Sequence, residues 1–387
     1  MDNHKISLVK CGSYDTAQVE NAVRRAVDLL GGIEGFVKPG EKVLLKPNLL
    51  TDTEPDKGIT THPEVVRAVI RLIRPITKNI FCGDAPSVWG EKRDVDRVYE
   101  TTGIKKVCNE EGAELVYFTH PVLKNGYPIA DWVFKCDRFI NIPKFKTHAY
   151  TILTAALKNL FGLIVGMHKM KVHFDNPKPS ELSRVIVDIY QMRKPDLNIL
   201  DGIVAMEGQG PGSAGTLRKF NLIAVGPDGL SMDVVLAHLM NLKVLDIPTN
   251  KEAISRGLGT GDLGSIEILG DKWRDFAVSD FKLPRAGLLS RLPKMPKFAA
   301  DIITSFLTGK PYPVVSRCKL CGACRKICPA SAIREVNEVH EVNEVNGVHG
   351  RMIFDRAKCI ACLCCQEVCP HNAIEIKKSL LMKILVR

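Results

Sequence analysis

The chain has 387 residues, of which 45% are hydrophobic and 25% are charged, and its formal net charge at pH 7 is +11. Such a composition is typical of globular proteins and excludes disordered and collagen-like chains. No run reaches the roughly 18 consecutive apolar residues that a membrane-spanning helix needs. The first residues also lack the basic and apolar regions of a secretory signal. We therefore expect a cytoplasmic protein with two or three domains and no transmembrane span.

Residues 1–280 alternate short β-rich runs with amphipathic helices. A helix is expected over residues 16–30, where two glycines end it, and a second helix is expected from Pro63 to about residue 74, since proline suits the first helical position. Strands are expected at residues 6–9, 43–45, 79–82, 115–117, 139–142, 197–200 and 222–225. Strands separated by helices predict an α/β domain with a mostly parallel sheet and helices on both faces.

Residues 281–316 contain five prolines among basic residues. We interpret them as a basic, proline-rich linker with one helix over residues 298–307. Such a charge could steer an acidic redox partner, bind anionic lipid or nucleic acid, or simply be solvated. Aromatic residues make up only 6% of the chain and do not alternate with basic ones. Nucleic acid is therefore not expected as a partner.

Nine of the thirteen cysteines lie between residues 318 and 369. A dense group of cysteines in a chain expected to be cytoplasmic indicates metal binding, not disulfides. The group repeats the pattern Cys-x2-Cys-x2-Cys-x3-Cys-Pro after 41 residues. Zinc sites use paired Cys-x-x-Cys sets instead, so two [4Fe–4S] clusters are the predicted cofactors. The eight cysteines of the pattern are Cys318, Cys321, Cys324, Cys328, Cys359, Cys362, Cys365 and Cys369.

The spacing also predicts how these cysteines are shared. Three cysteines of one copy wrap one cluster, and the fourth, at the start of a helix, reaches the other cluster. One cluster would take Cys318, Cys321, Cys324 and Cys369, and the other Cys328, Cys359, Cys362 and Cys365. Residues 317–387 resemble the bacterial two-cluster ferredoxins, which implies a small α+β domain.

Three features depart from that pattern. Leu363 stands where the first copy has Gly322, and Cys364 is an additional thiol beside the second cluster. Cys364 is either an alternative ligand or, as free cysteines often are, a packed apolar side chain. Residues 336–350 carry a valine at every third position, a period that fits neither strand nor helix. We interpret this tract as a surface expansion without chemistry.

Polar residues follow several predicted strands. Lys46 and Asn48 follow the strand at 43–45, Asp84 follows 79–82, and two lysines and a histidine follow 139–142. Ligands of open α/β sheets bind outside the carboxyl ends of the strands, where lysines suit a carboxylate or phosphate. Each feature alone also occurs as a solvated side chain or a simple turn, but together they predict an anionic small molecule. No G-x-G-x-x-G follows the first strand and no P-loop occurs, so a nucleotide is not indicated.

The same residues belong to a longer ordered series along the chain. The series is Lys46-Pro47-Asn48, Thr61-His62-Pro63, Gly83-Asp84-Ala85-Pro86, Pro143-Lys144-x-Lys146-Thr147-His148, Lys158-Asn159-x-x-Gly162 and Asp201-Gly202. It resembles the domain-of-unknown-function-362 family, whose members often carry a ferredoxin-like module at the C-terminus. The resemblance covers nearly the whole chain and implies an iron–sulfur protein. It makes the following residues site candidates: Asn48, His62, Asp84, Lys144, Lys146, His148, Lys158, Asn159 and His173.

Two hypotheses of function follow. In the first, a ferredoxin-type reductase passes low-potential electrons from an external partner through both clusters to the anionic substrate. His148, His173 and Lys158 would be catalytic, with a histidine donating protons. The substrate-binding residues would be Lys46, Asn48, His62, Asp84, Lys144, Lys146 and Asn159. In the alternative, the protein is a non-catalytic electron carrier or adaptor whose α/β domain docks a larger oxidoreductase. Group transfer with purely structural clusters is disfavoured, because no nucleotide-binding motif is present.

Overall fold

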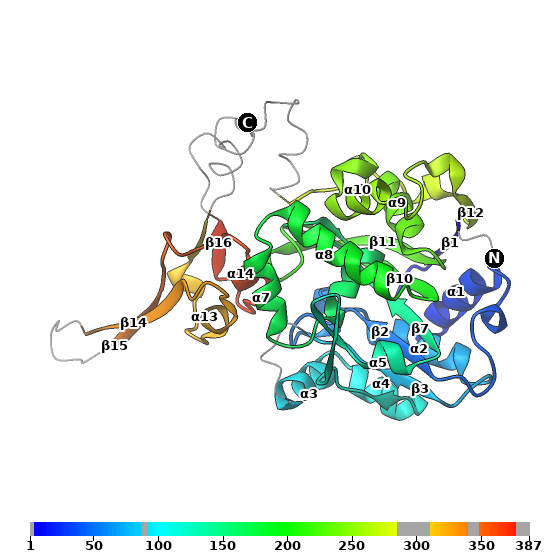
Figure 1. Cartoon of the computed structure of the whole chain (residues 1–387), viewed down its shortest axis with the longest axis horizontal. Coiled ribbons are helices and arrows are strands. Elements are labelled where there is room, and N and C mark those ends of the chain that lie inside the picture. The colour runs from blue at the N-terminus through cyan, green and yellow to red at the C-terminus, as the bar shows by residue number, and fades with distance from the viewer. Residues whose placement is uncertain (1–3, 87–91, 285–309, 340–347, 377–387) are drawn as a thin grey trace.

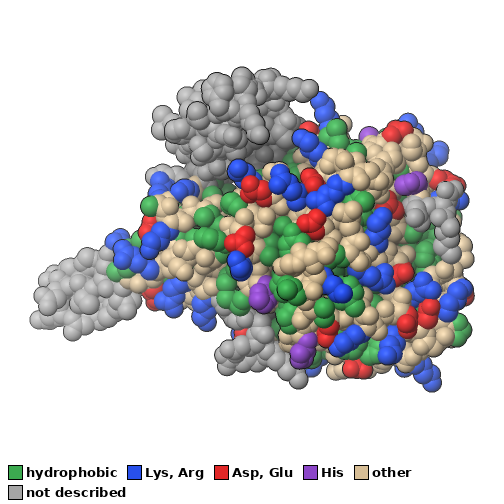
Figure 2. Space-filling model, viewed as in Figure 1, with side chains coloured by type: hydrophobic (Ala, Val, Ile, Leu, Met, Phe, Trp, Pro, Cys, Tyr) green, Lys and Arg blue, Asp and Glu red, His purple; other side chains and the backbone are tan. Residues whose placement is uncertain are grey.

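The computed structural model describes residues 4–86, 92–284, 310–339 and 348–376 (Figure 1). The helix expected over 298–307 lies outside the described residues, as does most of the expected linker. Within the described ranges, no helix is long and apolar enough to cross a membrane. On the face in Figure 2, Lys and Arg side chains are interspersed with Asp and Glu over the α/β part of the molecule.

A ten-stranded sheet forms the centre of the α/β part. The strands from β10 through β7, β2 and β3 to β4 are parallel, while β11 is antiparallel to both β10 and β1. The order is β12 (Glu267–Gly270), β1 (Lys5–Lys10), β11 (Gly215–Gly226), β10 (Leu197–Gly208), β7 (Arg138–Ile142), β2 (Val43–Pro47), β3 (Ile80–Cys82), β4 (Glu114–Leu115). β8 (Lys144–His148) pairs with β10, and β9 (Ile152–Thr154) pairs with β8. The expected mostly parallel α/β sheet is confirmed.

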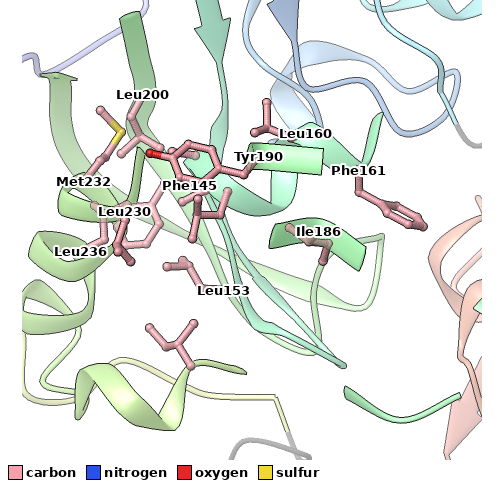
Figure 3. Close-up of a cluster of buried hydrophobic side chains, with 14 of the residues drawn as sticks. Phe145, Leu153, Leu160, Phe161, Ile186, Tyr190, Leu200, Leu230, Met232 and Leu236 are labelled. Carbon is pink, nitrogen blue, oxygen red and sulfur yellow. The ribbon is translucent and has the colours of Figure 1, made fainter. Parts of the chain in front are cut away.

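Helices cover both faces of this sheet, because alternate strand residues point to opposite sides. Leu44 packs into one buried cluster, whereas its neighbours Val43 and Leu45 pack into the other. The first cluster, part of which Figure 3 shows, lies under α5 (Trp132–Lys135), α6 (Ala156–Asn159), α8 (Pro179–Met192), α9 (Gly229–Leu239) and α10 (Pro248–Ser255). The second lies under α1 (Thr16–Asp28), α2 (Pro63–Ile73), α3 (Lys92–Thr101) and α4 (Ile104–Glu111). The expected coverage of both faces is thus confirmed.

All seven strands expected from the sequence are present, and the second expected helix begins at Pro63 with His62 as its N-cap. Two elements differ. Residues 144–148, where no strand was expected, form strand β8, which pairs with β10. Strand β10 runs on to Gly208 because the glycine-rich segment that follows turns it into a long hairpin with β11. A second hairpin joins β5 (Pro121–Lys124) to β6 (Tyr127–Ala130), and α7 (His168–Asp175) follows α6.

The C-terminal part has the helices and short strands of a ferredoxin-like domain. Strand β13 pairs with β16 and β14 pairs with β15, both antiparallel. The elements are β13 (Pro311–Pro313), α13 (Ala323–Ile327), β14 (Ile333–Val339), β15 (Val348–Phe354), α14 (Cys364–Glu367) and β16 (Ile374–Ile376). In Figure 1 the β14–β15 hairpin projects away from the α/β part, whereas α14 lies beside α7.

The valine-rich tract was interpreted wrongly in one respect. Its two ends, residues 336–339 and 348–350, lie in β14 and β15, although its period of three does not suggest a strand. Pairing with the opposite strand supplies the backbone hydrogen bonds, so the side-chain period does not decide the structure here. The middle of the tract lies outside the described residues.

Candidate functional site

The carboxyl ends of β2, β3 and β8 meet α6 and α7 at a cavity of about 60 Å³. This is the edge at which parallel strands of an α/β sheet present their ligands. Besides two leucines and Ala85, its wall consists of Asn48, Asp84, Lys146, His148, Thr154, Lys158, Asn159, Phe161, Gly162, Lys169, His173, Pro211 and Glu367. We call it the lysine cavity.

Asp84, in the wall of the lysine cavity, forms a buried ion pair with Lys46 at 2.7 Å. The Asp84 carboxylate also accepts hydrogen bonds from the backbone N–H groups of Leu49 and Ala85. Burial lowers the pKa of Lys46, an effect that the charge of Asp84 opposes. Gly162 lies so close to the pair that a Cβ atom there would stand 2.5 Å from Asp84 Oδ1 and 2.6 Å from Lys46 Nζ. A side chain at this position would therefore disrupt the pair.

Three asparagines hold one another beside this pair. Asn48 Nδ2 donates to Asn159 Oδ1 at 2.8 Å, and Asn159 Nδ2 donates to Asn141 Oδ1 at 2.7 Å. Asn159 Oδ1 also accepts from Lys46 Nζ at 3.3 Å. This series of hydrogen bonds fixes the orientation of the Asn48 amide. It leaves the amide oxygen without a hydrogen-bond partner among the described residues.

Three further lysines surround the cavity without a neutralising partner. Among the described residues, no carboxylate lies within ion-pair distance of Lys146, Lys158 or Lys169. Lys146 Nζ donates to the carbonyl of Ile59 at 2.5 Å, and Lys169 Nζ donates to the carbonyl of Ala85. Burial lowers the pKa of both Lys146 and Lys169 to about 7 and lowers that of Lys158 as well. A bound anion would restore the charged form of these lysines.

His148 faces Glu367, a residue of the ferredoxin-like domain. Its Nδ1 accepts hydrogen bonds from the backbone N–H groups of Tyr150 and Thr151, so the neutral ring carries its proton on Nε2. That Nε2 lies 3.3 Å from Glu367 Oε1, but not in hydrogen-bond geometry. Burial keeps the pKa of His148 well below its usual value and raises that of Glu367 to about 7.

Four buried polar atoms in the cavity wall lack a hydrogen-bond partner among the described residues. They are Asn48 Oδ1, Thr154 Oγ1, His173 Nδ1 and Glu367 Oε1. A buried polar atom left unpaired costs about 1–3 kcal/mol, so native proteins rarely tolerate several together. A polar ligand or bound water in the cavity would satisfy them. The three lysines without a carboxylate partner suit a small anion, and water bound beside it could donate to the unpaired oxygens.

The structure brings most of the predicted site residues together, but two of them lie elsewhere. Lys144 Nζ donates to Asp201 and to Tyr14, both within 2.8 Å, and Tyr14 stacks on the ring of His62 at 3.7 Å. Asp201 also accepts from the backbone N–H of His62 at 2.9 Å. Neither Lys144 nor His62 lines the lysine cavity. The sequence interpretation missed Lys169 and Glu367, which do line it.

The cysteines line two other cavities, each with three thiols from one copy of the motif and the fourth from the other. One contains Cys318, Cys321, Cys324 and Cys369, and the other Cys328, Cys359, Cys362 and Cys365. No three His, Cys, Asp or Glu side chains in the described ranges are arranged to hold a single metal ion.

Local backbone geometry around these cavities fits an iron–sulfur cluster. Backbone N–H groups of Ala332, Ala361 and Ala373 donate to cysteine sulfurs at 3.2–3.4 Å, and such hydrogen bonds stabilise thiolates that bind a metal. Leu363 adopts a left-handed conformation with φ of 62°, matching Gly322 with φ of 74° in the first copy. Cys364 lines neither thiol cavity but faces the α/β part.

The ferredoxin-like domain packs directly against the lysine cavity. Ser213 Oγ donates to the carbonyl of Cys369 at 2.8 Å, and Met170 of α7 packs on the cysteine-rich core. Gly212 approaches the carbonyl of Glu367 so closely that a Cβ atom would stand 2.6 Å from it. The second cysteine motif and the lysine cavity are therefore neighbours.

Fold and site together define an iron–sulfur protein whose 4Fe–4S domain is joined to an α/β domain. The family model "domain of unknown function (DUF362)" matches residues 43–238, and the model "4Fe-4S dicluster domain" matches residues 317–373. The chain belongs to the DUF362 family, and its 4Fe–4S domain implies electron transfer.

Relatives and solved structures add the following. The thylakoid-associated protein sll1697 of Synechocystis sp. is 33% identical over 286 residues, which cover 72% of this chain and 87% of that protein. The lactate racemase apoprotein of Thermoanaerobacterium thermosaccharolyticum shares 12% identity at a TM-score of 0.36, over 59% of this chain and 56% of its own. A Thermotoga maritima protein shares 14% identity at a TM-score of 0.34, over 55% and 56%. The chain thus spans about half of each solved structure, and likeness at this level supports no argument about activity.

Proposed function

We propose that this protein is an iron–sulfur oxidoreductase that passes electrons through two [4Fe–4S] clusters to a small anion in the lysine cavity. The single observation that carries the proposal is the position of Glu367. This residue lies on α14 between the cluster ligands Cys365 and Cys369 and also forms part of the cavity wall. A route from cluster to bound anion therefore needs no rearrangement of the domains.

The proposed ligand sets follow the two thiol cavities. One cluster would be held by Cys318, Cys321, Cys324 and Cys369, and the other by Cys328, Cys359, Cys362 and Cys365. When bound, the clusters supply one-electron transfers at low potential. Protein purified without oxygen should contain about eight iron atoms and eight acid-labile sulfides per chain. Colourless protein that contains zinc would contradict the proposal.

Residues of the cavity would bind the anion and deliver protons. Lys146 and Lys158 would hold the negative charge, and the Asn48 amide oxygen would accept a hydrogen bond from a water molecule bound beside the anion. His148 would donate a hydrogen bond through its Nε2–H, because its Nδ1 accepts from two backbone N–H groups. Lys169 is suited to supply the proton, because burial lowers its pKa to about 7 and it lies in the same wall. Burial by α14 would keep water away from the reacting atoms.

Electron transfer from reduced methyl viologen to unsaturated or activated carboxylates tests this function. Lys146→Met and Lys158→Met should each lower kcat/KM by about 10–100-fold, since each removes a charge-assisted hydrogen bond. Lys171→Met is the matched control, because Lys171 lies on α7 but is exposed and pairs with Asp175. Normal turnover by both cavity variants would show that the site is assigned wrongly.

The small volume of the cavity favours a second candidate, a non-catalytic electron carrier or adaptor. In that case the α/β domain docks a larger oxidoreductase, and its buried lysines bind only water. The two candidates differ in one measurement. A carrier would exchange electrons with its partner at the same rate with and without the carboxylates, and no carboxylate would be consumed.

We also propose a protein redox partner that supplies or accepts low-potential electrons, and a cytoplasmic location. The Synechocystis relative is thylakoid-associated, which makes the location worth testing directly. Separation of cells into soluble and membrane fractions is the test. Recovery of the protein with the membranes would contradict the proposed location.

A further inference from the structure

A second chamber adjoins the lysine cavity between α7 and α14. Its volume is about 30 Å³, and four residues belong to both walls. The shared residues are Phe161, Lys169, His173 and Glu367. The two chambers therefore adjoin each other at these four side chains. We call the second the methionine chamber.

The two chambers differ in chemistry. Most of the polar groups face the lysine cavity, whereas the part of the methionine chamber that is not shared is formed mainly by Met167, Met170, Ile327 and Val368. The Met167 side chain is 44% exposed, so the chamber reaches towards the surface on that side. Among the side chains that only the methionine chamber contacts, Cys364 carries a buried thiol, which behaves as a small hydrophobic group. A ligand there would contact apolar atoms.

We propose that one ligand fills both chambers, and that it is a short-chain monocarboxylate with its head among the lysines and an apolar tail against Met170, Ile327 and Val368. This inference rests on the proposed function, since it names the substrate class for the same site. A space of about 10–15 Å³ admits one water-sized group, so the two chambers admit on the order of six to nine non-hydrogen atoms. An acid of four carbon atoms fits this range.

The same geometry selects against a dicarboxylate. A second carboxylate at the far end of the ligand would lie among Met170, Ile327 and Val368, and Lys169, the lysine of this wall, already donates to the carbonyl of Ala85. Burial of an unpaired charge is strongly unfavourable. But-2-enoate and butenedioate have the same carbon skeleton and therefore form a matched pair of ligands.

Calorimetry on the iron-loaded, full-length protein under exclusion of oxygen tests the inference. Butanoate should bind about tenfold more tightly than acetate, as expected for two buried methylene groups, and trans-but-2-enoate at least tenfold more tightly than trans-butenedioate. Met170→Ala should shift the preferred acid from four carbon atoms to five or six, which a merely structural role of Met170 would not do. Met192→Ala, at a partly buried methionine of α8, is the control and should leave the preference unchanged.

The outcomes separate this inference from the proposed function. If acetate and butanoate bind equally and Met170→Ala does not shift the preference, the tail site is wrong while the anion site stands. If no carboxylate binds, or if Lys158→Met leaves every affinity unchanged, the anion site fails and both proposals fall. Tighter binding of butenedioate would also overturn the assignment, because the methionine chamber would then accept a charged group instead of an apolar tail.

Discussion

Two lysines of strand β8, Lys144 and Lys146, are both buried but have opposite surroundings. Lys144 is neutralised by Asp201 at 2.8 Å, and Tyr14 completes its hydrogen bonds. Lys146 has a single carbonyl as its partner and faces the lysine cavity. The comparison shows that a buried cation whose partners are all within the protein has a structural role. A buried cation without a carboxylate partner, such as Lys146, is a candidate to bind a ligand.

The largest expected effect is a difference in the free energy of unfolding between variants of these two lysines. Lys144→Met leaves the carboxylate of Asp201 buried without its cation and should lower the free energy of unfolding by about 3–5 kcal/mol. Lys146→Met removes an unpaired buried charge and should change it by less than about 1 kcal/mol. Urea denaturation of the two variants measures the difference. Equal destabilisation would show that Lys146 has a structural partner after all.

A smaller effect is expected from crowding the Lys46–Asp84 pair. Gly162→Ala would place a methyl group within 2.6 Å of both side chains, and overpacking of this kind costs about 1–3 kcal/mol. Gly12→Ala is the control, since nothing lies within 4 Å of a Cβ atom there. Thermal unfolding and carboxylate binding should both be impaired in Gly162→Ala only. An unaffected Gly162→Ala would mean that the pair can move without loss.

Disturbing the contact between the two domains should have a similar or smaller effect, in this case on activity. Gly212→Ala would place a methyl group 2.6 Å from the Glu367 carbonyl and should loosen α14 from the lysine cavity. We expect viologen-linked reduction of the substrate to fall by about tenfold while the visible spectrum of the clusters stays the same. Limited proteolysis of the variant should become faster. Full activity with unchanged proteolysis would argue against a functional contact.

The smallest effect concerns pH. The pKa values of Lys146 and Lys169 are lowered to about 7 by burial, so both lysines lose their charge as the pH rises above that value. Lys158 and the acidic side chains Asp84 and Glu367 share the same wall. The affinity for butanoate should be highest below pH 7 and fall severalfold between pH 7 and pH 8 as the lysines lose their charge. Calorimetry between pH 6 and pH 9 checks this, and a flat profile would contradict it.

Much of the fold could be predicted from the sequence, because its signals are local. Alternating apolar runs placed the strands, and Pro63 marked the start of a helix through its fixed backbone angle. The cysteine spacing predicted the sharing of thiols between two cavities, because three close cysteines can reach only one cluster. Residues 336–339 and 348–350 were misread, since pairing across a hairpin leaves no such local signal.

The members of the lysine cavity were harder to predict. His62 and Lys144 belong to the same ordered series as Lys146, but hydrogen bonds to Asp201 and stacking on Tyr14 direct them elsewhere. Glu367 offered one clue, because the first copy of the motif has Lys326 at the equivalent position, 41 residues earlier. Lys326 is exposed and Glu367 is buried against the other domain.

The sequence by itself determined the two domain types and the eight thiols, because periodicity and short spacings act within a few residues of each other. Only the tertiary structure decided which charges are neutralised and which remain. Asp201 reaches Lys144 across 57 residues and Glu367 reaches His148 across more than 200. Such pairings depend on how strands and domains pack, and no local pattern encodes them.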